Sequence, residues 1–209
     1  MIDLVTMHDK ALSFGVELND IQLMKLDQYA EMLVDWNTRI NLTSITDSEG
    51  IMIRHFEDSL AMLRYIYIPQ GAKMIDVGSG AGFPGLVLKI ARPDLQITLL
   101  DSLNKRISFL EAVAEKIELP VEALHLRAED GGKMKIYRER FDFACARAVS
   151  DLRELVEYCL PFVKVGGKFI SLKGPSVIDE LNAARPGIGQ LGGKVNCISS
   201  YSISDGSGR

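Results

Sequence analysis

The stretch Asp76-Val77-Gly78-Ser79-Gly80-Ala81-Gly82-Phe83-Pro84-Gly85 decides the fold, because it connects a short apolar segment to a helix-forming one. Glycines directly after a strand let the backbone turn sharply and let a ligand approach it without a Cβ in the way. Pro84 suits the first turn of the following helix, whose N-terminal amides point at the ligand. The stretch therefore predicts a nucleotide-binding turn.

The spacing of the glycines separates two ligand classes. A dinucleotide fingerprint, G-x-G-x-x-G, fails when counting begins at Gly78, because position 83 is Phe. Counting from Gly80 restores the spacing but places two glycines inside the helix. The alternative, acid-x-G-x-G-x-G, is satisfied by Asp76, Gly78, Gly80 and Gly82 and is typical of S-adenosylmethionine-dependent methyltransferases. This register favours S-adenosylmethionine.

Acidic residues follow the next two predicted strands. Asp101, with Ser102 beside it, ends the segment Gln96–Leu100, where a carboxylate accepts both ribose hydroxyls of a nucleoside. Ala128 and Glu129 follow Glu122–Leu126, at the tip that faces the adenine ring in such sheets. Either acid could instead be a helix cap or a solvated charge.

Strands and helices alternate from Lys73 onward. The further strands are expected at Phe141–Ala146, Lys168–Leu172 and near Val195–Ile203, and the helices at Leu86–Ala91, Lys105–Ile117, Asp151–Val163 and 176–184. This alternation predicts parallel βαβ units in a Rossmann-like three-layer α/β sandwich, the class I methyltransferase fold.

Residues 1–68 read as a helical extension. Apolar residues recur at helical spacing from Leu23 to Trp36, and Asn19 with Gln22 forms a candidate capping box. Thr46 and Glu49 form a second candidate, which opens a helix to about Tyr67. We expect this extension to form one wall of the substrate site, as a single compact unit with the methyltransferase domain at 69–209. The segment at 204–208 resembles a hairpin turn without its second strand, so the sheet is expected to lack its last antiparallel partner.

Composition restricts the class of protein. With 47% hydrophobic and 25% charged residues, the chain is typical of a globular domain, and no apolar run is long enough to cross a membrane. Three scattered cysteines form neither a disulfide framework nor a metal-binding pair, so we expect a cytoplasmic protein without a metal site. The net charge of −4 gives no global attraction to polyanions, so RNA binding would need a local basic face. Candidates for such a face are Lys105, Arg106, Lys133, Lys135, Arg138 and Arg140.

Several strings together resemble one bacterial family, the small-subunit rRNA guanine-N7 methyltransferases (RsmG, also called glucose-inhibited division protein B). They are Trp36-Asn37, Asn41-Leu42-Thr43, Arg54-His55-Phe56 with Asp58-Ser59-Leu60, Asp76–Gly85, Lys105-Arg106, Phe109-Leu110, Ala128-Glu129 and Arg147-Ala148-Val149. The resemblance implies S-adenosylmethionine as cofactor, with contacts at Gly78, Phe83, Ala128, Glu129 and Arg147. It implies a guanine of 16S rRNA near the decoding site as the target, in free RNA or in the assembled small subunit. Ala146 departs from the expected serine.

The chemistry agrees with this resemblance. Guanine N7 carries an in-plane lone pair and no proton, so the enzyme must supply position and electrostatic stabilisation rather than a general base. No Asn-Pro-Pro-Tyr segment follows the fourth strand and no Pro-Cys pair is present, which argues against adenine-N6 and cytosine-C5 transfer.

Three residues are candidates for the catalytic machinery. Arg147, at the end of the fourth strand, could hold the methionine carboxylate or guanine O6. Arg54 and His55 could contact RNA phosphate and stack on a base. We expect a monomer. A nicotinamide oxidoreductase and a non-catalytic nucleotide sensor remain as alternatives, the first disfavoured by the glycine register and the second testable by turnover.

Overall fold

A five-stranded parallel sheet forms the centre of the molecule. The computed structural model describes residues 1–147, 150–174 and 176–208. The strands are β1 (Lys73–Val77), β2 (Gln96–Asp101), β3 (Glu122–His125), β4 (Phe141–Arg147) and β5 (Val163–Leu172), and their order in the sheet is β3-β2-β1-β4-β5. All four pairings are parallel, and Ile75 of β1 lies opposite Thr98 of β2 and Ala144 of β4. The predicted fold class is confirmed.

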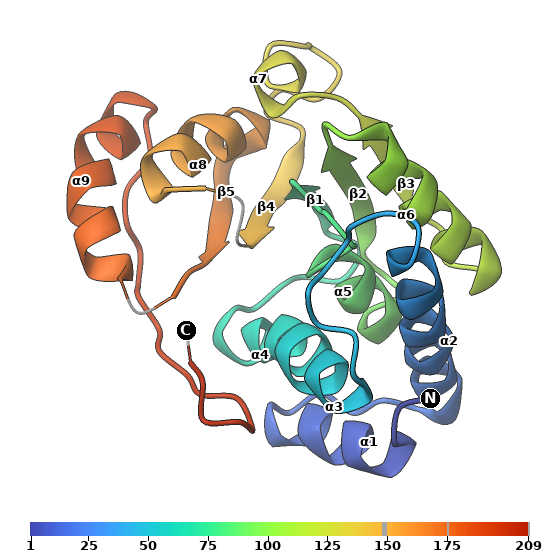
Figure 1. Cartoon of the computed structure of the whole chain (residues 1–209). Helices are drawn as coiled ribbons and strands as arrows, with labels where there is room; N and C mark the ends of the chain where they lie inside the picture. Colours follow the sequence, from blue (N-terminus) through green and yellow to red (C-terminus); the bar gives the residue numbers. More distant parts are fainter. Residues whose placement is uncertain (148–149, 175, 209) are drawn as a thin grey trace.

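Alternate residues of β1 face different cores. Met74 packs with the N-terminal helices, while Ile75 and Val77 pack with the C-terminal ones. On the first face lie α5 (Gly85–Ala91) and α6 (Asn104–Lys116); on the second lie α8 (Leu152–Cys159), the 3₁₀ turn at Leu160–Phe162 and α9 (Val177–Gln190), as Figure 1 shows. The short α7 (Ala128–Gly131) follows β3. Successive connections pass to opposite faces where β1 and β4 adjoin, and ligands of such sheets bind at this switch point, outside the carboxyl ends of the strands.

The N-terminal helices join the first core. They are α1 (Leu4–Ser13), α2 (Asp20–Asn37), α3 (Ser48–Gly50), the π-helix Ile51–Glu57 and α4 (Asp58–Tyr65). Tyr29 and Leu33 of α2 are completely buried and share a hydrophobic cluster with Met74 and Leu99 of the sheet. Residues on both sides of position 68 are therefore packed into one core.

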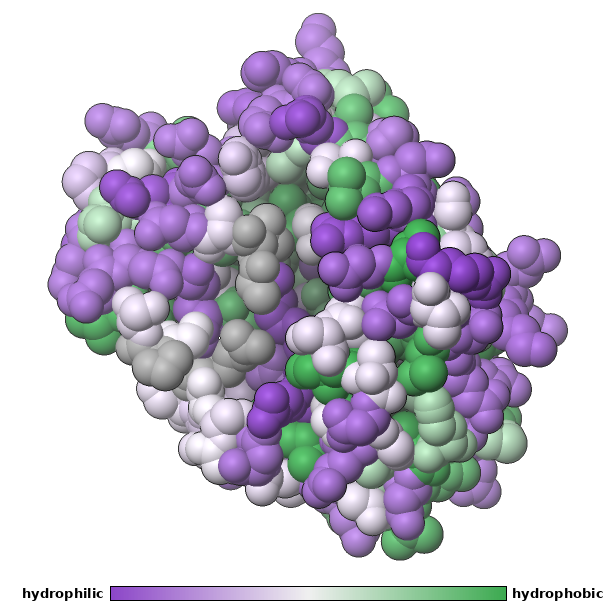
Figure 2. Space-filling view, in the orientation of Figure 1, coloured by the Kyte–Doolittle hydropathy of each residue, from purple (hydrophilic) through white to green (hydrophobic). Residues whose placement is uncertain are grey.

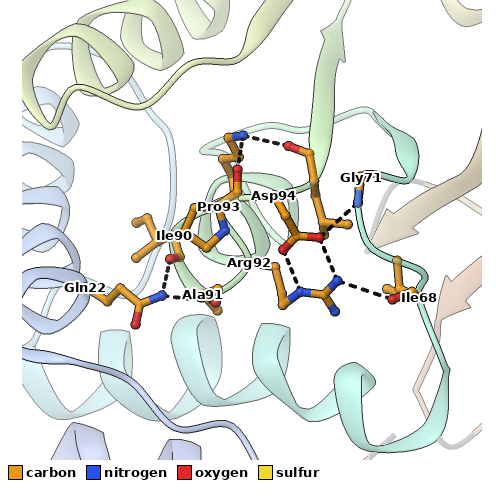
Figure 3. Close-up of polar contacts among 10 residues, drawn as sticks. Gln22, Ile68, Gly71, Ile90, Ala91, Arg92, Pro93 and Asp94 are labelled. Atoms are coloured by element: carbon orange, nitrogen blue, oxygen red, sulfur yellow. Dashed lines mark hydrogen bonds and ion pairs between the residues drawn. The ribbon is translucent and has the colours of Figure 1, made fainter.

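Gln22 caps α2 with one end of its side-chain amide and ties α2 to α5 with the other. Its carbonyl oxygen accepts from the Asn19 N–H (2.9 Å), and the Asn19 side chain accepts from the Gln22 N–H, so the predicted capping box is confirmed. Its amide nitrogen donates to the carbonyls of Ile90 (2.8 Å) and Ala91 (3.0 Å), as Figure 3 shows. These carbonyls belong to the last turn of α5, where no helical partner exists.

A second group in Figure 3 ties the chain before β1 to the turn before β2. The Arg92 guanidinium donates to both oxygens of Asp94 at 2.8 Å, and Asp94 also accepts from the Gly71 N–H (3.1 Å). Hydrogen bonds from Arg92 lower the pKa of Asp94 to about 2, because they stabilise its charged form.

Three expectations about secondary structure are wrong, and one boundary is misplaced. The helix expected over Asp151–Val163 ends at Cys159, and β5 begins at Val163 rather than at Lys168. No strand forms near Val195–Ile203 within the described residues, where an isolated bridge joins Ser202 to Gly208; Ile203 instead packs on the N-terminal helices, away from any strand that could pair with it. The helix expected at 176–184 continues to Gln190, because Pro186 is exposed and water can serve the carbonyl that loses its helical partner. The helix expected to open at Thr46 begins at Ser48, with Asp47 as its cap accepting from the Gly50 N–H (2.7 Å).

The face of the molecule shown in Figure 2 is hollowed near its centre and is mainly hydrophilic, with hydrophobic residues in scattered patches. Across the described ranges, no helix combines the length and the apolar character that a membrane span requires.

Candidate functional site

The glycine turn after β1 is held by β2. The backbone N–H groups of Gly78 and Ser79 donate to the Leu100 carbonyl at 2.8 and 3.0 Å. Gly78, Gly80 and Gly82 have φ values of 73°, 58° and 98°, which side-chain-bearing residues rarely adopt. A Cβ at Gly80 would meet open space apart from the Gly78 carbonyl, so a ligand can reach the backbone there.

Gly82 is required on the opposite side of the turn. A Cβ at this residue would lie 2.6 Å from both the Tyr29 hydroxyl and Leu86. The Tyr29 hydroxyl donates to the Ala81 carbonyl, so a residue of α2 supports the turn from behind. This support explains why the N-terminal helices and the turn are packed together.

Asp76 lies beneath the turn and does not line the cavity described below. It is completely buried, and its Oδ2 accepts from the Gly85 N–H at 2.9 Å, while Oδ1 has no hydrogen-bond partner in the described part of the chain. Burial raises the pKa of Asp76 to about 7, against the opposing effects of the Gly85 N–H and the Arg147 charge. Asp76 thus braces the start of α5.

Asp101 faces the same turn from the tip of β2. Its Oδ2 accepts from the Gly80 N–H (2.9 Å) and from Arg106 Nη1 (3.3 Å), and its Oδ1 accepts from the Leu103 N–H (2.9 Å). A carboxylate offers about four acceptor positions. One position therefore remains, and displacement of the longer Arg106 contact would provide the second that a ribose diol needs.

Arg147, at the end of β4, is fixed by residues of the N-terminal helices. Its Nη1 donates to Asp58 Oδ2 (2.8 Å) and to the Arg54 carbonyl (3.1 Å). The guanidinium lies over the Phe83 ring, 5.0 Å from its centroid, within the range of cation–π attraction. Only 7% of the Arg147 side chain and 1% of the Asp58 side chain are exposed, so this is a buried ion pair.

His55 stacks on Phe83 with 4.3 Å between the ring centroids. Its Nδ1 lies 3.4 Å from Arg147 Nη2 and its Nε2 lies 2.9 Å from Thr43 Oγ1. An arginine can only donate, so Nδ1 must accept, and we assign the proton to Nε2, which donates to Thr43. His55 and Phe83 both line the cavity described below, although His55 is only 8% and Phe83 only 5% exposed, and Tyr29 stacks on Phe83 as well.

A cavity of about 360 Å³ joins these groups at the carboxyl ends of β1, β2 and β4. Its lining comprises Leu42, Thr43, His55, Gly78, Ser79, Gly80, Ala81, Phe83, Asp101, Ser102, Arg106 and Arg147. It thus combines one wall from the N-terminal helical segment with the glycine turn and two strand ends.

The structure brings together only part of the predicted site. The lining includes the predicted residues His55, Gly78, Ser79, Gly80, Phe83, Asp101, Ser102 and Arg147; outside it lie Arg54, Asp76, Gly82, Ala128 and Glu129. Glu129 is exposed at the start of α7. Arg54 turns to a second cavity of about 510 Å³, where its Nε donates to Asp205 (2.9 Å). Ala148 and Val149 of the Arg147-Ala148-Val149 string lie outside the described residues.

Two supporting residues were missed from the sequence. Tyr29 sits within the apolar stripe of α2, where nothing distinguishes its hydroxyl from those of other core tyrosines. Asp58 belongs to the family string, but nothing in the sequence pairs it with Arg147. A buried arginine needs a carboxylate partner, and that rule does not say which of the acids supplies it. Both lie far from their partners in the chain, 52 residues from Ala81 and 89 from Arg147.

Comparison with known families gives one match over most of the chain. The model of the GidB family, described as rRNA small subunit methyltransferase G, matches residues 22–204. Ribosomal RNA small subunit methyltransferase G of Alkaliphilus oremlandii is 52% identical over 88% of this chain and 78% of that protein. The protein of the same name from Clostridium perfringens (strain SM101) is 47% identical over 91% of this chain and 80% of that protein.

Solved structures agree on the fold. A methyltransferase-like protein from Bacillus halodurans superposes with a TM-score of 0.56, at 15% identity over 69% of this chain and 72% of that chain. The precorrin-6y C5,15-methyltransferase of Geobacter metallireducens gives 0.54, at 16% identity over 77% of both chains. At such identities the likeness supports the α/β methyltransferase fold alone.

Proposed function

The chain belongs to the family of rRNA small subunit methyltransferase G, and we propose that it methylates N7 of a guanine in 16S rRNA near the decoding site, using S-adenosylmethionine. One observation carries the proposal: a single cavity contains a glycine turn and carboxylate suited to a nucleoside, beside a buried arginine and an aromatic pair suited to a base.

The residues around the turn fit S-adenosylmethionine. The open side of Gly80 admits a ligand to the backbone, and Asp101 keeps acceptor capacity for ribose hydroxyls. Gly78, Ser79 and Ser102 complete this part of the lining. When bound, S-adenosylmethionine supplies the electrophilic methyl group. We assign Asp76 and Gly82 to the support of the turn rather than to contact with the cofactor, and Ala128 and Glu129 to the adenine side of the site.

The remaining residues suit a nucleophile that carries no proton. Guanine N7 attacks through its lone pair, so positioning and electrostatic stabilisation suffice. Asp58 already neutralises Arg147, which favours a neutral acceptor such as guanine O6 over a second carboxylate. An Arg147 donor to O6 would orient the base and leave N7 open, while the His55–Phe83 pair offers an aromatic surface beside it.

The RNA would dock around the mouth of this cavity. Residues 1–68 would form one wall of the substrate site, because Leu42, Thr43 and His55 line the cavity. Lys133 and Lys135 are exposed and lie in the segment between β3 and β4, where they could contact phosphates. We propose a cytoplasmic monomer that acts on free 16S rRNA or on the assembled subunit.

The decisive experiment supplies labelled S-adenosylmethionine and small ribosomal subunits that lack the modification, followed by chemical cleavage of the RNA at N7-methylguanine. We expect label at one guanine and its loss in Arg147→Ala. Arg153→Ala is the matched control, because Arg153 is an exposed arginine paired with Asp151 on α8. Binding of S-adenosylmethionine without label in the RNA would refute the proposed substrate while leaving the cofactor assignment intact. Parallel reactions on free 16S rRNA identify the form of substrate, and sedimentation of the enzyme tests the monomer.

A further inference from the structure

The segment that follows α9 returns to the N-terminal helices and reaches the back of the Arg147 ion pair. Figure 1 shows its last part beside α4. The Tyr201 hydroxyl lies 3.0 Å from Asp58 Oδ1, while Asp58 Oδ2 accepts from Arg147 at 2.8 Å. Tyr201, Asp58 and Arg147 therefore form a chain of hydrogen bonds that ends at the cavity.

The ring of Tyr201 is fixed independently of its hydroxyl. It stacks on Tyr65 with 5.6 Å between centroids and meets Phe14 edge-on at 6.1 Å. Farther along the segment, the backbone N–H and hydroxyl of Ser204 donate to Glu57 Oε1 at 3.0 and 2.7 Å. These contacts hold the hydroxyl at a defined place against the Asp58 carboxylate.

The Asp58–Arg147 ion pair is buried, so the position of the Tyr201 hydroxyl affects its stability and geometry. A buried ion pair is stabilising only when its geometry is good and the remaining lone pairs are satisfied. The Tyr201 hydroxyl donates to Asp58 Oδ1, whereas Arg147 donates to Oδ2, and the hydroxyl adds no charge to the ion pair. It thereby fixes the rotation of the carboxylate, and hence the direction in which Oδ2 pulls Arg147 Nη1.

Arg147 lines the cavity, so a change in its position changes the shape of the cavity wall. The same guanidinium contacts the Phe83 face and His55 Nδ1, so a tilt of Asp58 would move Arg147 relative to both. We propose that Tyr201 is a positioning residue for methyl transfer, acting through Asp58 on Arg147. This inference rests on the proposed function, in which Arg147 orients the target base.

The test compares Tyr201→Phe with Tyr65→Phe. The first removes the hydroxyl and keeps both ring contacts; the second removes the hydroxyl of the stacking partner, for which the described residues show no hydrogen bond. We expect Tyr201→Phe to lower kcat for RNA methylation about tenfold, the effect of losing one hydrogen bond to a charged group. KM for the subunit and cofactor affinity should stay close to those of Tyr65→Phe, which should itself behave as wild type. Tm should fall in Tyr201→Phe, because the buried Asp58 carboxylate loses a hydrogen bond.

A double-mutant cycle distinguishes positioning from general stability. In an Arg147→Lys background the guanidinium is absent, so Tyr201→Phe should cause no further loss of kcat. Wild-type kcat in Tyr201→Phe, or the same tenfold loss in the Arg147→Lys background, would overturn the inference. An Arg147→Ala enzyme with full activity would instead overturn the proposed role of Arg147 and with it this inference. Loss in Arg147→Ala together with wild-type kcat in Tyr201→Phe would overturn the inference alone.

Discussion

The amide of Gln22 offers a measurable test of how the N-terminal helices are attached. It makes one capping bond within α2 and two bonds to the end of α5. Each net hydrogen bond contributes about 0.5–1.5 kcal/mol, and partly buried carbonyls left without a partner add to the cost. Gln22→Ala should therefore lower the free energy of unfolding by about 2 kcal/mol, which at this chain length corresponds to a fall in Tm of about 4–8 °C.

Gln22→Glu separates the two functions of the side chain. A glutamate still accepts from the Asn19 N–H, but it cannot donate to the Ile90 and Ala91 carbonyls and places negative charge beside them. We expect Gln22→Glu to lose at least as much stability as Gln22→Ala in urea unfolding followed by circular dichroism. Gln28→Ala is the control, because Gln28 is exposed on the same helix and should change stability by less than about 0.5 kcal/mol. Wild-type stability in Gln22→Glu would refute the reasoning, because the capping bond alone would then account for the residue.

Three further predictions concern the glycine turn, Asp76 beneath it and Asp94 in the turn before β2. Gly82→Ala should abolish measurable cofactor binding in calorimetry, because its Cβ would meet Tyr29 and Leu86, whereas Gly80→Ala, with open space, should retain weakened binding. The free energy of unfolding of Asp76→Asn should rise relative to that of wild type by about 1.4 kcal/mol for each pH unit between pH 4 and 7. The reason is the raised pKa of the Asp76 carboxyl, which makes the wild-type protein less stable as pH rises through that window. A difference that does not change with pH in urea unfolding would contradict this. The pKa of Asp94 is lowered, so its contribution to stability is present above pH 4 and is lost as pH falls through about 2. Asp94→Asn should therefore lower Tm at pH 7 and match the Tm of wild type near pH 2. An equal loss of Tm at both pH values would count against the pairing with Arg92.

The parts of the fold predicted correctly are those encoded in neighbouring residues. The glycine turn, Asp101 at a strand tip and the Asn19–Gln22 capping box depend on residues a few positions apart. Two of the errors have different causes. Apolar residues near Val195–Ile203 resemble a strand, but a strand needs a partner, and Tyr201 and Ile203 pack on the N-terminal helices instead. Pro186 is an ordinary helix-breaking signal that solvent exposure made harmless.

The candidate site was predicted less completely because its supports come from distant segments. Glycines and acids of the turn are visible in the sequence, whereas Tyr29 and Asp58 are recognisable only once α2 and α4 are placed against β1 and β4. The π-helix at Ile51–Glu57 also left no signal in the residues. Within it, the Arg54 carbonyl accepts from Arg147 and the His55 ring stacks on Phe83.

The hydrogen-bond chain from Tyr201 to Arg147 also has a consequence for the order in which the molecule forms. Its two links join residues 143 and 89 positions apart, and contacts of such sequence separation are slow to close because the intervening chain must first lose its conformational freedom. During synthesis, α2, β1 and the glycine turn can pack while Arg147 and Tyr201 are still being added. We therefore expect amide protection in pulsed hydrogen exchange to appear at β1 and α5 before it appears in β4. A refolding chain would then possess its nucleotide-binding turn before it could orient a base, so affinity for the cofactor would be acquired earlier than the capacity for methyl transfer.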